Sequence, residues 1–366
     1  MKRYLVSTTA SVLLLLTPGS PLLVHPSLHS NPHRKPAAHL SCSNGGIPAE
    51  SANKHQWDAF AHHQAKRWFG VWSTHDAEGM LMDEVDLDTD LRLSADGQEI
   101  EHVNTLYGGS IKSDCERCHD SVDTREVCVG TYTPDTLRQI ACGPAYLSGP
   151  SVSRRGALTT EIGLSRPDFR VRCIVIHAIP DDQLQGIDPP TSLRLDRIVL
   201  VRENLKSHPI RGYKASEVVW AEPEPTRLLG LWRGKRQTLV PSPGLPKIEW
   251  GEENVAPTHL RKCRCSGAGD EGEEGVARLD FQGGIRLEAP RQVLAGEPTS
   301  LALSWLPKGG GEQHSVLRGE VGFRALGRVK DTVYSKGGMQ QVVISPPEML
   351  RFDVEELEPV ASAGLP

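Results

Sequence analysis

Beyond about residue 67, apolar residues occur in short runs that favour β-branched side chains and end at Gly, Pro or Asp. Several runs alternate apolar and polar positions, as Leu301, Leu303 and Trp305 do, which is the pattern of a strand with one buried face. The clearest expected strands cover residues 127–132, 169–176, 192–201, 300–306, 316–323 and 341–345. Helical patterns of ten or more residues are almost absent here. The pattern therefore predicts an all-β protein of antiparallel strands.

One helix is expected, ahead of the first strand. Trp57, Phe60, Gln64 and Trp68 follow the 3.6-residue spacing of an amphipathic helix. We therefore predict a short helix over residues 55–67 that leads directly into a strand.

Composition supports a turn-rich fold and excludes some functions. The chain has 366 residues with 35 glycines and 27 prolines, a surplus that argues against a helical bundle or a long coiled coil. Its 41 Lys and Arg residues and 46 Asp and Glu residues give a net charge of -5, spread along the chain. Because there is no basic field to neutralise phosphates, nucleic-acid binding is not expected.

The first 49 residues contain no Asp or Glu and have the character of a targeting leader. Lys2 and Arg3 precede an apolar stretch that ends at Pro18, which is typical of a signal peptide, and the Ser-, Pro- and His-rich part that follows has the composition of a transit peptide. Together they predict import into a plastid (chloroplast) behind an extra membrane, and a plain secretory leader is the alternative. No other stretch has the ~20 apolar residues of a membrane span, so no transmembrane segment is expected.

The tripeptide Gly-x-Trp occurs twice, with Gly70 and Trp72 in WFGVWS and Gly230 and Trp232 in LLGLWRG. The two tryptophans lie 160 residues apart, and repetition at this distance indicates a duplicated domain. The expected units are a leader over residues 1–50, a first antiparallel β-domain over 54–215 and a second over 216–360.

In a small closed barrel, a large ring near the start of the first strand plugs the open end, and a glycine lets the backbone pass close to it. Trp72 and Trp232, each with its glycine, suit this structural role. An Arg from the last strand of such a barrel covers the ring, and Arg202 in IVLVREN is the candidate in the first half.

The runs HQWDAFAHHQAKRWFGVW, LDRIVLVREN and LLGLWRGK resemble a lipocalin-like family of photosynthetic organisms known as domain of unknown function 3598. The resemblance is strongest over about residues 55–205. It implies two tandem calycin barrels, related at the level of the fold to the S-type chromophore lyases that load bilins onto phycobiliproteins.

Cys115, Cys118 and His119 match Cys-x-x-Cys-His, the attachment motif of c-type haem. The surrounding polar stretch lacks the helix that such sites usually occupy. A zinc site that adds Cys263 and Cys265, a redox-active thiol pair and ordinary loop cysteines are the other interpretations. These residues are weak metal candidates, so no metal is expected.

Cys128, Cys142 and Cys173 lie on or beside apolar runs and are expected to be small core residues. The acidic run over residues 83–90 lacks the glycine and terminal glutamate of an EF-hand loop, and its alternation favours the outer face of a strand.

Arg172 is the candidate ligand-binding residue. It shares one face of its expected strand with Arg170, Ile174 and Ile176. If that face points into the barrel, its guanidinium can clamp a carboxylate of a bilin or a fatty acid. The alternative is that Arg170 and Arg172 lie on the solvent face.

No nucleophile and base pattern, nucleotide-binding loop or HExxH motif is present in the sequence. We therefore expect a plastid lipocalin-like protein that binds an apolar small molecule (a tetrapyrrole or bilin, a carotenoid or a lipid) without catalysis. One alternative is a bilin chromophore lyase acting on phycobiliproteins, and a phycobiliprotein or other photosynthetic protein would then be its partner. The other is an assembly or scaffold protein whose barrels are filled with side chains.

Overall fold

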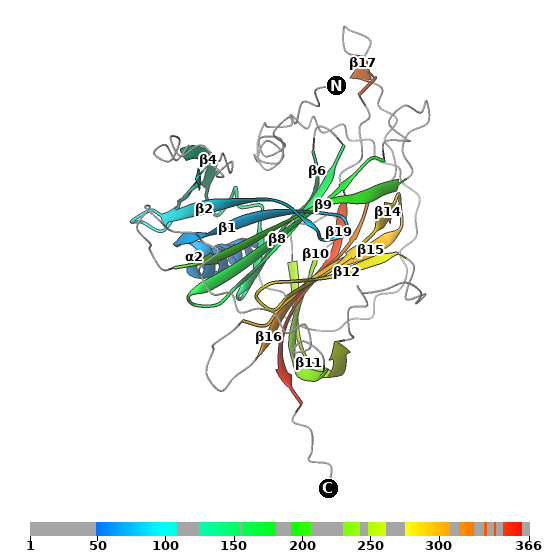
Figure 1. Cartoon of the computed structure of the whole chain (residues 1–366). Helices are drawn as coiled ribbons and strands as arrows, with labels where there is room; N and C mark the ends of the chain where they lie inside the picture. Colours follow the sequence, from blue (N-terminus) through cyan, green and yellow to red (C-terminus); the bar gives the residue numbers. More distant parts are fainter. Residues whose placement is uncertain are drawn as a thin grey trace, which may run out of the picture.

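The computed structural model describes most of the chain from residue 49 onwards, and its strands form two large antiparallel sheets (Figure 1). The described residues are 49–107, 124–153, 156–180, 192–205, 230–241, 248–260, 275–307, 315–325, 333–334, 340–341 and 347–360. Nearly all of the expected leader lies outside them, as do Cys115, Cys118, His119, Cys263 and Cys265. The leader and the Cys-x-x-Cys-His motif therefore stay predictions.

The helix α2 spans Ala49–Gln64, so it begins earlier and ends sooner than the sequence predicts. Its end is set by Trp68, whose indole Nε1 donates to the carbonyl oxygen of Gln64 at 3.0 Å. That carbonyl is one of the last acceptors of a helix that have no partner within it. Trp57 and Phe60 are buried, so the helix packs through the face that its spacing predicts.

The first sheet contains the strands of the N-terminal half, coloured blue to green in Figure 1, in the order β4-β3-β2-β1-β9-β8-β7-β6-β5. Their bounds are β1 Arg67–Asp76, β2 Leu81–Leu93, β3 Ile100–Tyr107, β4 Thr124–Tyr132, β5 Ile140–Cys142, β6 Ala145–Val152, β7 Leu158–Ser165, β8 Phe169–Ala178 and β9 Ser192–Asn204. The first strand, β1, lies between β2 and the last strand, β9. This arrangement is that of a curled sheet that forms half of a barrel.

The second sheet contains strands of the C-terminal half, coloured yellow-green to red, in the order β11-β10-β19-β16-β15-β13-β12. Their bounds are β10 Gly230–Pro241, β11 Ile248–Leu260, β12 Val276–Phe281, β13 Ile285–Pro290, β15 Pro298–Trp305, β16 Val316–Arg324 and β19 Glu348–Pro359. The short strands β17 (Val333–Tyr334) and β18 (Gln340–Gln341) pair with each other. Strand β14 (Gln292–Leu294) pairs with β9, so the C-terminal half adds a strand to the first sheet.

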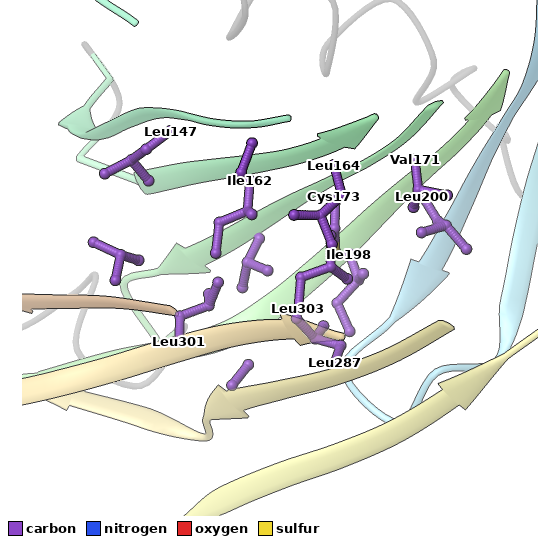
Figure 2. Packing of buried hydrophobic residues seen from close by; sticks show 14 of the residues in the cluster. Leu147, Ile162, Leu164, Val171, Cys173, Ile198, Leu200, Leu287, Leu301 and Leu303 are labelled. Atoms are coloured by element: carbon purple, nitrogen blue, oxygen red, sulfur yellow. The ribbon is translucent and has the colours of Figure 1, made fainter. Parts of the chain in front are cut away.

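The largest apolar cluster lies between the two sheets. Figure 2 shows Ile162 and Leu164 of the first sheet facing Leu301 and Leu303 of the second. The sheets approach so closely that a Cβ atom added at Gly319 would lie 2.9 Å from the Cγ2 atom of Ile162. Because side chains alternate along a strand, the other half of each sheet's residues point away from this interface. For each sheet, we call the face that points away from the other sheet its inner face.

These sheets confirm the predicted fold class, because the described chain is mostly β with one helix. The expected strands at residues 127–132, 169–176, 192–201, 300–306 and 316–323 lie within or largely within β4, β8, β9, β15 and β16. The acidic run forms part of β2 and alternates with the buried Val85 and Leu87. Cys142 and Cys173 are buried in the inter-sheet cluster, and burial raises the pKa of both thiols.

The close-packed glycines of the two sheets reveal a repeat with a different offset. A Cβ atom at Gly70 of β1 would overlap a carbonyl oxygen of β9, and one at Gly234 of β10 would overlap a carbonyl oxygen of β19. Each glycine is two residues after a buried tryptophan, Trp68 in the first sheet and Trp232 in the second. The structurally matching motif is therefore Trp-x-Gly at an offset of 164 residues, four more than the spacing of the Gly-x-Trp pair.

Two buried histidines join the first sheet to the C-terminal half. The Nε2 atom of His177 lies 2.8 Å from the carbonyl oxygen of Pro290, and the ring of His75 packs on Phe281 with centroids 4.8 Å apart. Burial lowers the pKa of His177 to about 4 and, together with the charge of Arg202, that of His75 to about 4.

Acid is therefore expected to weaken the folded state. An unfolded His has a pKa of about 6.5, so between that pH and about 4 the unfolded chain binds more protons than the folded chain. The free energy of unfolding therefore decreases as the pH is lowered through this range. For His177 the loss is roughly 2 kcal/mol by about pH 5. Urea unfolding at neutral and acidic pH measures it, and His177→Gln, which keeps a donor for Pro290, should show a shallower acid slope. An unchanged slope in the variant would exclude His177 as the cause.

Candidate ligand site

Strand β8 places Arg170 and Arg172 on the inner face of the first sheet. Their neighbours Val171 and Cys173 belong to the inter-sheet cluster, so alternation directs the two arginines to the opposite side. Arg170 is 1% exposed and Arg172 is 5% exposed, so neither lies on a solvent face. The sequence contained a signal that both faces of β8 are buried, because this strand carries apolar residues on both of its faces, and such strands are buried on both sides.

Arg170 forms a two-pronged ion pair with Glu203 of β9. Its Nε and Nη2 atoms lie 2.6 and 2.9 Å from the two carboxylate oxygens, and Glu203 is 0% exposed. The guanidinium also stacks over the ring of Trp68, with its Cζ atom 4.6 Å from the ring centroid. Gln64, at the end of α2, accepts a third hydrogen bond from Arg170 at 3.3 Å. This pair is therefore fully enclosed and held on several sides.

Arg172 is shared between two carboxylates. Its Nε and Nη2 atoms both lie 3.0 Å from oxygens of Glu203, and its Nη1 atom lies 3.5 Å from Oε1 of Glu161 on β7. Thr89 of β2 accepts from Nη2 at 3.3 Å. The hydroxyl of Tyr146 on β6 donates to the same Oε1 atom of Glu161 at 2.6 Å. The cluster thus spans five strands of the sheet.

The four charged groups of this cluster, Arg170, Arg172, Glu161 and Glu203, balance one another. Burial opposes ionisation of Glu203, but attraction and hydrogen bonds from Arg170 and Arg172 outweigh it and lower its pKa to about 2. Burial likewise opposes the charge of Arg172, and the nearby Glu203 raises its pKa. Glu203 and Arg172 are therefore charged throughout the neutral pH range.

His102 of β3 is a neutral neighbour of the cluster. Burial, with Arg172 and Arg170 nearby, lowers the pKa of His102 to about 3. Its Nδ1 atom lies 3.0 Å from the Tyr132 hydroxyl, and its Nε2 atom lies 3.2 Å from Oδ1 of Asn104. His102 is thus an uncharged, positioned ring rather than a proton donor at neutral pH.

An apolar belt continues along the inner face from the charged cluster. Ile174 follows Arg172 on the same face of β8, and Val201 of β9 lies directly opposite Arg172 in the register. The belt comprises Trp72, Val85, Leu87, Leu106, Ala157, Ile174, Ile176, Val199 and Val201, all 9% exposed or less. The inner face therefore combines a long apolar surface with buried guanidinium groups at one end.

The second sheet has apolar residues where Arg170 and Glu203 lie in the first. Glu203 and Leu357 each pair with the close-packed glycine of the first strand of their sheet. Arg170 pairs with Glu203 from the other side, and Val316 pairs with Leu357 in the same way. Trp232 packs with Val316 and Leu357. The stacked Arg and Glu pair is thus special to the first sheet.

Arg318 of β16 is the second sheet's counterpart of Arg172, because it follows Val316 by two residues just as Arg172 follows Arg170. It lies 2.7 Å from Glu320, and 3.4 Å from both Glu288 and Glu355. Around it the inner face of the second sheet carries further ion pairs, and the apolar cluster with Trp232 is small. The second sheet therefore lacks a belt like that of the first within the part of the chain described.

The residues expected to plug the barrels are placed as follows. Trp72 and Trp232 are each 4% exposed and packed in apolar clusters. Arg202 does not cover Trp72, because the register pairs Trp72 with Val201 and puts Arg202 on the other face of the sheet. There it lies 3.3 Å from Glu84. The arginine that stacks on a tryptophan is Arg170, one strand earlier.

The other candidates that lie within the described residues form no site. In the described ranges, no group of three or more His, Cys, Asp and Glu side chains is placed to hold a metal ion. In the acidic run of β2, Asp88 is nearly buried and pairs with Arg67 at 2.6 Å, so it serves the sheet. Among the described helices, none is both long enough and apolar enough to cross a membrane.

A meander of antiparallel strands that curls until its first strand pairs with its last, around a polar and apolar inner face, defines a calycin-like all-β protein. Residues 53–208 match the sequence model of the N-terminal domain of DUF3598, a domain of unknown function. This part of the chain, which forms nearly all of the first sheet, matches the model of the DUF3598 family, so the predicted resemblance is confirmed.

Solved structures with a similar fold include a DUF3598-family protein of unknown function from Nostoc punctiforme PCC 73102. It is 14% identical, with a TM-score of 0.50 over 83% of this chain and 99% of that chain. The S-type phycobiliprotein lyase CPES from Guillardia theta is 14% identical, with a TM-score of 0.26 over 44% of this chain and 98% of that chain. No curated protein matches the chain. The likeness to the Nostoc protein describes the fold, and the function must be argued from the site.

Proposed function

We propose that this chain is a plastid protein that binds an amphipathic small molecule on the inner face of its first sheet, without catalysis. The ligand has an apolar body, as a bilin or other tetrapyrrole, a carotenoid derivative or a lipid has, and it carries a carboxylate. The observation that carries the proposal is the position of Arg172, a buried guanidinium at the end of an apolar belt. A ligand whose carboxylate binds Arg172 and whose apolar body lies along Ile174 and Val201 would match both the guanidinium and the apolar belt.

The energetics of the cluster support a functional role. Replacing buried ion pairs with well-packed apolar residues is often neutral or stabilising, so such a pair is weak evidence for a purely structural role. At the positions of the second sheet that match Arg170 and Glu203, this chain has the apolar residues Val316 and Leu357. The charged cluster in the first sheet is therefore not required by the fold type.

The test measures binding of biliverdin and of a fluorescent polyene fatty acid to the full chain. We expect Arg172→Gln to weaken binding about tenfold or more, because a hydrogen-bonded charge pair is lost. Arg318→Gln, at the matching position of the second sheet, is the control and should leave affinity unchanged. The methyl ester of each probe tests the same contact without any substitution, and its affinity should fall by a similar factor.

Absence of binding for both probes and for a carotenoid would overturn this proposal. That result would favour a scaffold protein with filled barrels, a second candidate supported by the ion pairs that already satisfy Arg172 and Arg318. Covalent transfer of a bound bilin to a phycobiliprotein subunit in the same assay would replace binding without catalysis by a lyase activity.

A further inference from the structure

We propose that Glu161 occupies the place of the ligand's carboxylate on Arg172, and that ligand binding displaces it with the uptake of one proton. This inference rests on the proposed function and specifies how the site selects an acidic ligand. In the free protein Glu161 completes the partners of Arg172, and in the complex the ligand would take its position.

The two carboxylates on Arg172 are not equivalent. Glu203 accepts hydrogen bonds from both the Nε and Nη2 atoms of Arg172 at 3.0 Å. It also accepts hydrogen bonds from Arg170 and is 0% exposed. Glu161 meets only the Nη1 atom, at 3.5 Å, the longest contact of the guanidinium, and its side chain is 16% exposed. Glu161 is therefore the partner that an incoming carboxylate can replace.

Charge balance then requires a proton. The groups around Glu161 are the two guanidiniums of Arg172 and Arg170, the carboxylate of Glu203, the phenol of Tyr146 and the nearby imidazole of His102. A ligand carboxylate would bring three negative charges against two positive ones into a buried site, where an uncompensated charge is costly. Protonation of Glu161 restores the balance, since the ligand carboxylate plus one proton adds no net charge.

Solvent is the source of this proton. Burial and the nearby Glu161 raise the pKa of Tyr146 well above its usual value, so the phenol keeps its proton and its hydrogen bond to Glu161. His102 is neutral at physiological pH and has no proton to give up as an acid. The acid form of Glu161 can accept from Tyr146 through one oxygen and donate through the other to the ligand carboxylate. No bond other than those of the transferred proton is made or broken.

The experiment follows the affinity of the full chain for cis-parinaric acid, a fluorescent fatty acid, from about pH 6.5 to 8.5, where the free acid is ionised. Uptake of one proton on binding makes the association constant fall about tenfold per pH unit. Glu161→Gln keeps the acceptor for Tyr146 without a titrating group, so its affinity should be nearly independent of pH. The methyl ester, which has no carboxylate, should show no slope with the unchanged protein.

Calorimetry in two buffers with different ionisation heats counts the protons directly and needs no variant. We expect about one proton per ligand at neutral pH with the unchanged chain. Binding without proton uptake, or a slope that persists in Glu161→Gln, would overturn this inference and leave the binding proposal standing. Failure of the probe to bind at any pH would instead count against the proposed function.

Discussion

Replacing Glu203 with leucine is expected to lower the free energy of unfolding by about 3–5 kcal/mol. The substitution leaves the buried guanidinium of Arg170 without its two-pronged partner, and the longer contact with Glu161 is then the one carboxylate contact that Arg172 keeps, beside its hydrogen bond to Thr89. The expected loss comes from the guanidinium of Arg170, which stays buried without a charged partner. Leucine itself is not the cause, because an apolar side chain is well suited to a buried position. Urea unfolding of the variant and the unchanged chain at neutral pH measures the loss.

The matched control is the double substitution of Arg170→Val with Glu203→Leu. It installs the residues that the second sheet carries at the matching positions, Val316 and Leu357 beside Trp232. Arg172 then faces Glu161, one charge of each sign, and most of the lost stability should return. A double variant as unstable as the single one would show that the cluster stabilises the fold by more than its charge balance.

The pH dependence of the same comparison has a defined sign. The folded-state pKa of Glu203 is lowered to about 2, against about 4.3 for an unfolded Glu. A group with a lowered pKa contributes its stability above the unfolded value and loses it as pH falls towards the folded value. The difference between Glu203→Leu and the unchanged chain should therefore shrink between about pH 4.3 and pH 2.

Gly70→Ala is expected to cost about 3 kcal/mol, near the top of the range for overpacked positions. The added Cβ atom would overlap the carbonyl oxygen of Arg202, and backbone atoms cannot move aside as a flexible side chain can. Strands β1 and β9 pair in register around this point, so the overlap forces the central pair of the first sheet apart. Thermal or urea unfolding of the variant measures the cost.

Gly251→Ala is the control for this substitution. Gly251 also lies in a strand, β11, but a Cβ atom there has no other atom within 4 Å. Its stability should change by less than about 0.5 kcal/mol. Equal losses at both positions would mean that the effect at Gly70 reflects strand glycines in general and not the approach of β9.

The strands and the helix could be predicted because their signals are local. The apolar runs of β8 and β9 and the helical spacing of Trp57 and Phe60 depend on neighbours within a few residues. The repeat could be detected but not aligned from two tripeptides. Which glycine matches which depends on the strand that passes beside it, and only the pairing of Gly70 with β9 and of Gly234 with β10's neighbour β19 decides that.

The candidate site was predicted in part. Arg172 was identified as the residue that would matter if its face pointed inwards, and the structure puts it there. Arg202 was expected to cover Trp72, but the register with β1 puts it on the other face of β9. Glu203 and Glu161 were missed, because a buried Glu differs from an exposed one only through partners on other strands.

By itself, the sequence determined that this is an all-β, turn-rich protein with tryptophans on its strands, and it identified Arg172 as a residue that could point inwards. These properties follow from periodicity and composition, which each segment carries within itself. The tertiary structure decided which face of β8 is buried against the second sheet, and hence that Arg170, Arg172 and Glu203 meet. Burial and ion pairing are properties of segments brought together across the sheet, so they follow from strand order and register and cannot be obtained from any one strand.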